Sequence, residues 1–125
     1  MPKGKLTYRR GEIWWVNLNP IVGSETGKER PCLILQNDVG NKSATTTIVA
    51  PLLPGHKNYP FVVNISPTTQ NGLRGERYVN LSQLRAVDAL RIKKKQGVLE
   101  DSYWASIERA IAVELGFEQT FNHRF

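Results

Sequence analysis

Cysteine is nearly absent from this sequence of 125 residues, which contains only Cys32. A single cysteine excludes an intrachain disulfide and any metal site built from several thiolates. Histidine is almost as scarce: His56 and His123 have no cysteine, aspartate or glutamate neighbour at metal-ligand spacing. The sequence therefore predicts no metal site and no cofactor. Cys32 itself lies in an apolar run, where a thiol usually packs as part of the core.

Long hydrophobic runs are also missing, since no segment approaches the ~18 apolar residues that a membrane span requires. The N-terminus, MPKGKLTYRR, is basic but has no apolar segment behind it. We therefore predict no membrane contact and no secretory signal, and we expect a cytoplasmic protein. Neither a Walker-type phosphate loop nor a GxGxxG motif occurs, and Ser24 does not lie in a G-x-S-x-G nucleophile elbow.

Acidic residues are few and unevenly placed, with 17 Lys and Arg against 11 Asp and Glu. Residues 1–95 contain 15 basic and 6 acidic residues, a surplus of +9, whereas residues 96–125 contain 2 and 5, a deficit of −3. The densest basic block is Arg74–Lys95. A basic body of this kind favours a polyanionic partner, either nucleic acid or an acidic protein segment. A solvated basic surface without a partner remains the alternative.

Short β-branched and apolar segments separated by turn residues predict a series of strands at roughly ten-residue spacing. The run at 31–36 is almost continuously apolar, which predicts burial on both faces. The predicted strands are Ile13–Leu18, Pro31–Gln36, Thr45–Leu53, Tyr59–Ile65, Arg77–Leu81, Ser82–Val87 and, more weakly, Ile92–Val98. Together they predict a small barrel or a compact sheet.

The C-terminal region predicts one amphipathic helix of about four turns. Its apolar positions recur at helical spacing, and they are Trp104, Ile107, Ile111 and Leu115. Asp101 is the predicted N-cap, Gly116 stands where a glycine ends a helix, and Phe117 is the expected apolar cap contact. No repeat and no linker divides the chain, so we predict a single domain over residues 1–125.

One polar segment between two strands is suited to phosphate chemistry without a metal. RNA carries its own nucleophile, the 2′-hydroxyl, so an enzyme must orient it, remove its proton and stabilise charge on the phosphate. Arginine performs the last task well, because its planar fork matches two phosphate oxygens and it keeps its charge. Arg30 begins the second strand, and Pro31 biases it to an extended conformation. A charged residue that merely covers a strand end is the alternative interpretation of Arg30.

Several motifs resemble the MazF/PemK (Kid-like) toxin endoribonucleases of type II toxin–antitoxin systems. The segment RGEIWWVNLNP is followed by GSETGKERP, and an apolar strand then leads into QND. Further along the chain come TTTIVAP, KNYPFVV, Gly72-Leu73, SQLRAVD and the terminal helix, so the resemblance covers most of the chain.

This resemblance implies a mainly β (α+β) fold, a small SH3-like barrel of about five to seven strands with a C-terminal amphipathic helix. It also implies a homodimer whose substrate groove spans both subunits. The implied activity is a sequence-specific, metal-independent endoribonuclease that cleaves single-stranded RNA by 2′-hydroxyl attack and leaves a 2′,3′-cyclic phosphate. The implied inhibitor is a small antitoxin whose acidic, disordered tail folds onto the basic groove.

The resemblance assigns catalysis to Arg30, the arginine of the RP pair, and to Ser24, the serine of GSE. The residues expected to contact RNA are Glu25, Lys28, Asn37, Asn80, Ser82, Gln83 and Arg85. Two positions depart from the family pattern, because Leu53 stands where many relatives have a Thr or Ser, and Ser82 where some have an Asp.

These departures leave the general base open, with Ser24, Glu25 and Ser82 as candidates. They also leave two alternative functions open. One is a non-catalytic nucleic-acid-binding module of the same fold, and the other is a CcdB-type toxin that acts on gyrase.

Overall fold

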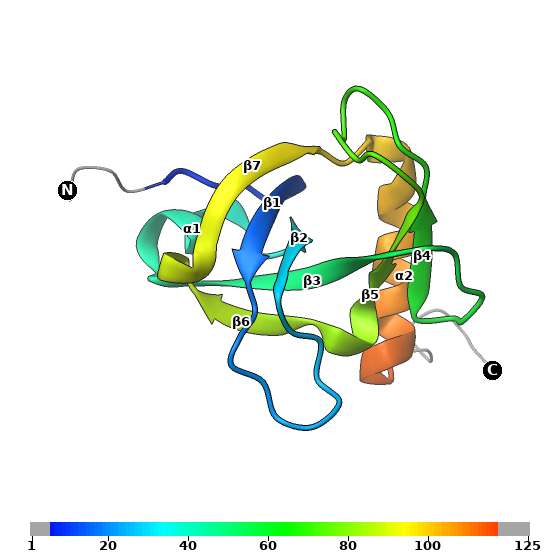
Figure 1. Ribbon diagram of the computed structural model, residues 1–125, viewed down its shortest axis with the longest axis horizontal. Coiled ribbons are helices and arrows are strands. Elements are labelled where there is room, and N and C mark those ends of the chain that lie inside the picture. The colour runs from blue at the N-terminus through cyan, green and yellow to red at the C-terminus, as the bar shows by residue number, and fades with distance from the viewer. Residues whose placement is uncertain (1–5, 118–125) are drawn as a thin grey trace.

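The computed structural model describes residues 6–117. They form a curved β-sheet with one long helix packed against it (Figure 1). The strands are β1 (Glu12–Asn17), β2 (Glu29–Ile34), β3 (Thr46–Pro54), β4 (Val62–Ile65), β5 (Arg77–Asn80), β6 (Arg85–Asp88) and β7 (Ile92–Val98). The helices are α1 (Asp38–Ser43) and α2 (Trp104–Leu115), and the 3-10 turns are η1 (Leu81–Gln83), η2 (Ala89–Arg91) and η3 (Asp101–Tyr103). The predicted mainly β fold with a C-terminal helix is therefore confirmed.

All strand pairs are antiparallel, in the order β4-β5-β3-β2-β1-β7, and β6 also pairs with β3. Strand β3 organises the sheet: its first half pairs with β6 and its last residues pair with β5. The sheet curls so that β7 arches over β1, and α2 stands beside β4 and β5 (Figure 1). The β1–β2 loop, residues 18–28, projects from the opposite side of the sheet from this arch.

Two apolar clusters fill the two faces of the sheet. The larger lies under α2 and includes Ile13, Leu33, Leu52, Ile65, Val79, Leu81 and Ile107. The smaller includes Tyr8, Trp14, Val16, Cys32, Ile34, Val49 and Val87. Because strand side chains alternate between faces, β2 sends Leu33 into one cluster and Cys32 and Ile34 into the other. The predicted double-sided burial of this strand is confirmed.

Helix α1 occupies a segment that the sequence marks only as turn. Asn37 begins it, because its Oδ1 accepts a hydrogen bond from Gly40 N at 2.8 Å. Asn41 then anchors it to the sheet: this side chain is 6% exposed and its Oδ1 accepts from Thr47 Oγ1 at 2.6 Å. Caps and buried hydrogen bonds, rather than helix propensity, make this short helix.

Two strands, β4 and β6, begin three residues later than predicted. The strand predicted from Ser82 begins only at Arg85, because Asn80 Oδ1 accepts hydrogen bonds from both the N and the Oγ of Ser82 and bends the chain into η1. Such local side-chain bonds compete with strand pairing. Strand β4 begins at Val62, because the 59–61 segment forms a turn before it.

The start of the C-terminal helix is also different, and its end is as predicted. Asp101 as the N-cap is wrong, since it is the first residue of η3, and α2 begins at Trp104 without a side-chain cap. Gly116 ends α2 in the left-handed conformation with φ of 78°. The amide of Phe117 then donates to the carbonyl of Ala112 at 2.7 Å, a common way to close a helix.

Candidate active site

Arg30 lies at the rim of the smaller apolar cluster, at the start of β2. It pairs with Val16 of β1, so the two side chains share a face of the sheet. Val16 is fully buried, whereas Arg30 is half-buried and its Nε donates to the carbonyl of Gly27 at 3.3 Å. Arg30 therefore shares a face with a buried apolar residue and remains partly exposed to solvent.

The β1–β2 loop is anchored by the segment that follows β5. The side-chain oxygen of Gln83 accepts a hydrogen bond from Thr26 N at 3.1 Å. Arg85 Nη1 donates to the carbonyl of Leu18 at 3.1 Å. Two residues from the SQLRAVD segment thus fix the loop that carries the GSE motif.

Inside the loop, Glu25 and Lys28 have structural contacts of their own. Glu25 Oε1 accepts from Val22 N at 2.8 Å, which leaves its second carboxylate oxygen free. Lys28 adopts a positive φ of 69°, and its amide donates to Asn19 Oδ1 at 3.0 Å. Ser24 is exposed in the turn that immediately precedes Glu25.

A cavity of about 370 Å³ lies where the loop meets η1 and the start of β6. We call it the loop cavity, and its lining residues are Glu25, Thr26, Ser82, Gln83, Leu84 and Arg85. The structure therefore brings together four of the residues that the sequence associated with RNA, from positions far apart in the chain.

The other three residues of that set do not line the loop cavity. Asn37 caps α1 beyond the C-terminal end of β2, whereas Arg30 is at its N-terminal end. Asn80 stands next to the cavity, but its side chain is engaged by Ser82. Lys28 is exposed beside Arg30. The structure thus separates Asn37 from the rest.

Leu53 stands near the end of β3 and has no hydroxyl to offer. It lies two residues beyond Pro51, where the pairing of β3 with β2 ends at Cys32. Leu53 in turn pairs with Tyr78 of β5. The position where many relatives supply a hydroxyl is apolar here, and Tyr78 is the neighbouring side chain on the same face.

The site carries arginine side chains that no acidic side chain of the described residues neutralises. Among residues 6–117 the structure forms one ion pair, Lys95 Nζ to Glu12 Oε2 at 3.1 Å. Arg30 and Arg85 therefore make no ion pair within this part of the chain. Both lie close enough to Cys32 for their charges to favour its thiolate, yet burial dominates and raises the pKa of that thiol to about 12. Cys32 is consequently an inert core residue, and the free cations are available to an anion.

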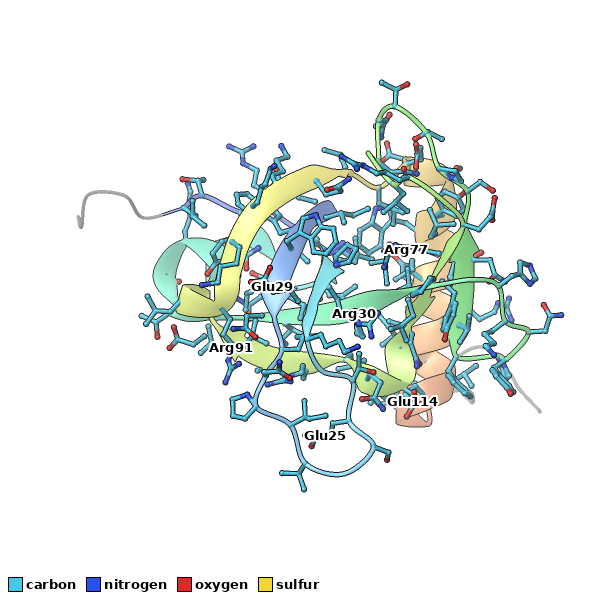
Figure 2. All side chains as sticks on the ribbon, viewed as in Figure 1. Glu25, Glu29, Arg30, Arg77, Arg91 and Glu114 are labelled. Carbon is cyan, nitrogen blue, oxygen red and sulfur yellow. The ribbon has the colours of Figure 1, made fainter. Side chains whose placement is uncertain are left out.

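Arg77 belongs to the same surroundings, and no sequence motif singled it out. Its Nη1 donates to the carbonyl of Leu52 at 2.8 Å. Burial, and then the charge of Arg30, lower the pKa of the Arg77 guanidinium from its ordinary value. Figure 2 shows Arg30 and Arg77 entering the space between β2 and β5. Only its place in the basic block 74–95 could have drawn attention to it.

The described residues offer no obvious place for a metal. Between Leu6 and Phe117 no cluster of three or more His, Cys, Asp or Glu side chains has the geometry to hold an ion. No helix in that range is long and apolar enough to cross a membrane. The arrangement can bind a phosphate with arginine and accept a proton on a carboxylate.

Comparison with known proteins gives a consistent picture. A family model described as PemK-like, MazF-like toxin of type II toxin-antitoxin system matches residues 9–115. Endoribonuclease MazF of Staphylococcus epidermidis is 34% identical over 118 residues, covering 93% of this chain and 98% of that protein. Endoribonuclease EndoA of Bacillus subtilis is 30% identical over 108 residues, covering 86% of this chain and 93% of that protein.

Solved structures extend the likeness to three dimensions. The crystal structure of MazF from Deinococcus radiodurans has a TM-score of 0.77 at 25% identity and covers 89% of this chain and 98% of that one. A mycobacterial endoribonuclease in complex with its cognate antitoxin has a TM-score of 0.70 at 21% identity, covering 87% of this chain and 95% of that one. The second likeness concerns the fold alone.

Proposed function

The chain belongs to the PemK-like, MazF-like toxin family of type II toxin–antitoxin systems, and we propose that it cleaves single-stranded RNA at the site around Arg30. It is an endoribonuclease, as are the relatives whose whole length it matches. The observation that carries the assignment of the site is the half-buried Arg30 guanidinium, which makes no ion pair among residues 6–117 and lies at the start of the strand that follows the loop. The non-catalytic module and the gyrase-directed toxin are not favoured, because the curated relatives are named endoribonucleases.

Arg30 stabilises the negative charge that develops on the scissile phosphate. Its apolar backing and its bond to Gly27 hold the guanidinium in place before substrate arrives. Preorganised donors of this kind make a large contribution to catalysis, ~3–4 kcal/mol for a single good donor. Arg85, at the wall of the loop cavity, adds positive charge for the phosphates on either side.

Glu25 takes the proton of the 2′-hydroxyl in this proposal. It lines the loop cavity. Its Oε1 accepts a hydrogen bond from Val22 N, and its Oε2 remains free to accept a proton. Leu53 cannot take part in proton transfer, and the hydroxyl of Ser82 already donates to Asn80 at 2.6 Å. The 2′-oxygen then bonds to phosphorus and the bond to the 5′-oxygen breaks. The departing 5′-oxygen takes up a proton from water, so a 2′,3′-cyclic phosphate and a 5′-hydroxyl result. Ser24, exposed on the loop, donates a hydrogen bond to the substrate phosphate.

RNA bases are read by the neutral polar side chains around the loop cavity. Gln83 and Ser82 present amide and hydroxyl groups from η1, and such groups distinguish base edges while basic residues hold phosphates. The loop that Gln83 anchors gives this pocket its shape. Sequence preference is therefore a property of η1 and the loop together.

The protein partner of this toxin is an antitoxin with an acidic segment. Toxins of this fold have been solved in complex with an antitoxin, among them the mycobacterial endoribonuclease and MazF from Deinococcus radiodurans. On this chain the unpaired cations of the site offer charge complementarity to acidic side chains. Such a segment excludes RNA because it covers the same arginines.

The activity itself has a direct test that requires no partner. We expect the purified protein to cut single-stranded RNA in the presence of a chelator, because the mechanism uses only protein side chains and the substrate's own hydroxyl. Mass spectrometry of the products should find 2′,3′-cyclic phosphate ends. RNA carrying 2′-O-methyl groups should resist cleavage. Activity that vanishes with chelator and returns with Mg²⁺, or cleavage of the 2′-O-methyl RNA, would contradict this mechanism.

We also expect the protein to form a homodimer. Large apolar side chains are exposed around the start of β3, with Val39 of α1 79% exposed, Ile48 of β3 37% and Leu90 of η2 84%. Exposed apolar groups gathered in this way often mark an interface. Light scattering at micromolar concentration should give about twice the 14.1 kDa chain mass. A mass near that of one chain would exclude a groove shared between subunits.

A further inference from the structure

A second hollow lies on the face of β2 opposite to Arg30. Its volume is about 470 Å³, within the range of ~300–1,000 Å³ typical of ligand sites. We call it the basic cleft, and its lining residues are Trp15, Glu29, Pro31, Leu73, Arg74, Arg77, Lys93, Lys94 and Gln96. Strand pairing explains the arrangement, because Trp15 of β1 stands directly between its partners Pro31 of β2 and Lys94 of β7.

The charge of the basic cleft is strongly one-sided. Four cations line it, Arg74, Arg77, Lys93 and Lys94, against the single carboxylate of Glu29. None of the four makes an ion pair among residues 6–117, since the one pair formed there joins Glu12 to Lys95. Lys95 follows Lys93 and Lys94 in β7, but its charge is neutralised by Glu12 outside the cleft. Cations gathered without counter-charges attract an anionic ligand.

Two of the lining groups are already fixed in orientation. The indole Nε1 of Trp15 donates to Gln96 Oε1 at 2.6 Å, and the Gln96 amide nitrogen donates to the carbonyl of Gly72. The guanidinium of Arg77 is held by the Leu52 carbonyl at 2.8 Å. An aromatic ring and a cation are therefore positioned before any ligand enters, which lowers the entropy that binding must overcome.

We propose that the basic cleft binds a nucleotide of single-stranded RNA that flanks the scissile position, with its base against Trp15 and its phosphate between Arg74, Arg77 and Lys94. This inference rests on the proposed function of the Arg30 site. An aromatic surface beside a row of cations is the combination by which proteins hold single-stranded nucleic acid. An acidic peptide would satisfy the cations but would leave the oriented indole without a matching partner.

The location of the basic cleft supports a continuous RNA path. Glu29, Arg30 and Pro31 are consecutive on β2, so Arg30 faces one side while its two neighbours line the cleft on the other. Arg30 and Arg77 both enter the space between β2 and β5 (Figure 2). RNA that passes over this end of β2 can place one phosphate on Arg30 and a flanking nucleotide in the cleft.

The test compares two lengths of uncleavable RNA. The probes are 2′-O-methyl oligonucleotides of mixed sequence, one confined to the nucleotides around the scissile phosphate and one extended at both ends. The variant Arg74→Gln/Lys94→Gln removes two exposed charges of the basic cleft. The matched control Lys42→Gln/Arg109→Gln removes two exposed charges from α1 and α2.

We expect the cleft variant to bind the extended probe about 10-fold more weakly and the short probe within about 2-fold of wild type, as for lost phosphate contacts on a single strand. The control should change both affinities little and equally. Trp15→Leu should give the same length-dependent loss, while Trp15→Tyr, which keeps an aromatic surface, should restore most of it. Melting temperatures identify variants that fail to fold. If Trp15→Leu is one of them, the Arg74→Gln/Lys94→Gln variant still tests the proposal.

Equal losses for both probes, or no loss with the extended probe, would overturn the proposal. A cleft variant that binds extended RNA normally but loses affinity for poly-glutamate would assign the cleft to an acidic protein segment instead. Cleavage of unmodified RNA by the wild-type protein is measured in parallel. If the wild type cuts RNA and the length dependence is absent, only the basic cleft is refuted, whereas absence of any cleavage refutes the proposed function.

Discussion

Arg30→Ala is expected to reduce RNA cleavage by about 10²–10³-fold or more, as for removal of a preorganised donor to a developing charge. The guanidinium has no carboxylate partner among the described residues, so its removal leaves no buried charge uncompensated. The side chain is only half-buried at the end of β2, and the melting temperature should change little. Cleavage rates at saturating RNA, together with thermal unfolding of each variant, measure both effects.

Two further variants sharpen this prediction. Arg30→Lys should remain strongly impaired, because an ammonium cannot make the two-pronged phosphate contact of a guanidinium. Arg109→Ala, an exposed arginine on α2, should cleave at the wild-type rate. A folded Arg30→Ala protein that cuts RNA as fast as wild type would place the active site elsewhere.

Asn71→Ala is expected to produce the largest loss of stability, about 3 kcal/mol, as for several buried hydrogen bonds left unmade. Asn71 is 0% exposed. Its Nδ2 donates to the Ser66 carbonyl at 2.9 Å and to Glu100 Oε1 at 3.2 Å. Its Oδ1 accepts from the amides of Thr68 and Leu73, each at 3.0 Å. Alanine would leave these groups without Asn71 as a partner, and the amide of Leu73, whose bond to Asn71 is buried, would be left unsatisfied.

Chemical denaturation and thermal unfolding measure this loss, which should lower the melting temperature by ~10 °C or more for a domain of this size. Asn64→Ala is the matched control, because Asn64 also bridges a loop through two hydrogen bonds, to the N and O of Lys57. Those bonds are solvent-exposed, so water replaces them and the cost should stay below about 1 kcal/mol. Equal stability of the two variants would show that the Asn71 network does not hold the β4–β5 connection.

Local sequence signals predicted most of the elements correctly. The apolar run around Cys32 is a strand buried on both faces, and Gly116 ends α2 with a positive φ. These features depend on hydrophobic pattern and on backbone preferences of single residues, which neighbours in the chain determine. Helix α1 escaped prediction, because Asn41 stabilises it through Gln36, which follows β2, and Thr47, which lies in β3. A local helix pattern does not reveal such side-chain contacts.

The sequence by itself also identified the family and the basic character of the chain, and it singled out Arg30 as the candidate catalytic residue, because motif and net charge are properties of residue order alone. Tertiary structure decided which residues meet. Pairing register sets Arg30 on one face of β2 and Pro31 on the other, pairs Leu53 with Tyr78, and gathers Trp15, Arg77 and Lys94 around one cleft. It also assigns Asn37 to a helix cap and Lys95 to an ion pair with Glu12. A one-residue change of register would move every side chain of a strand to the opposite face, and register depends on long-range pairing that no local motif encodes.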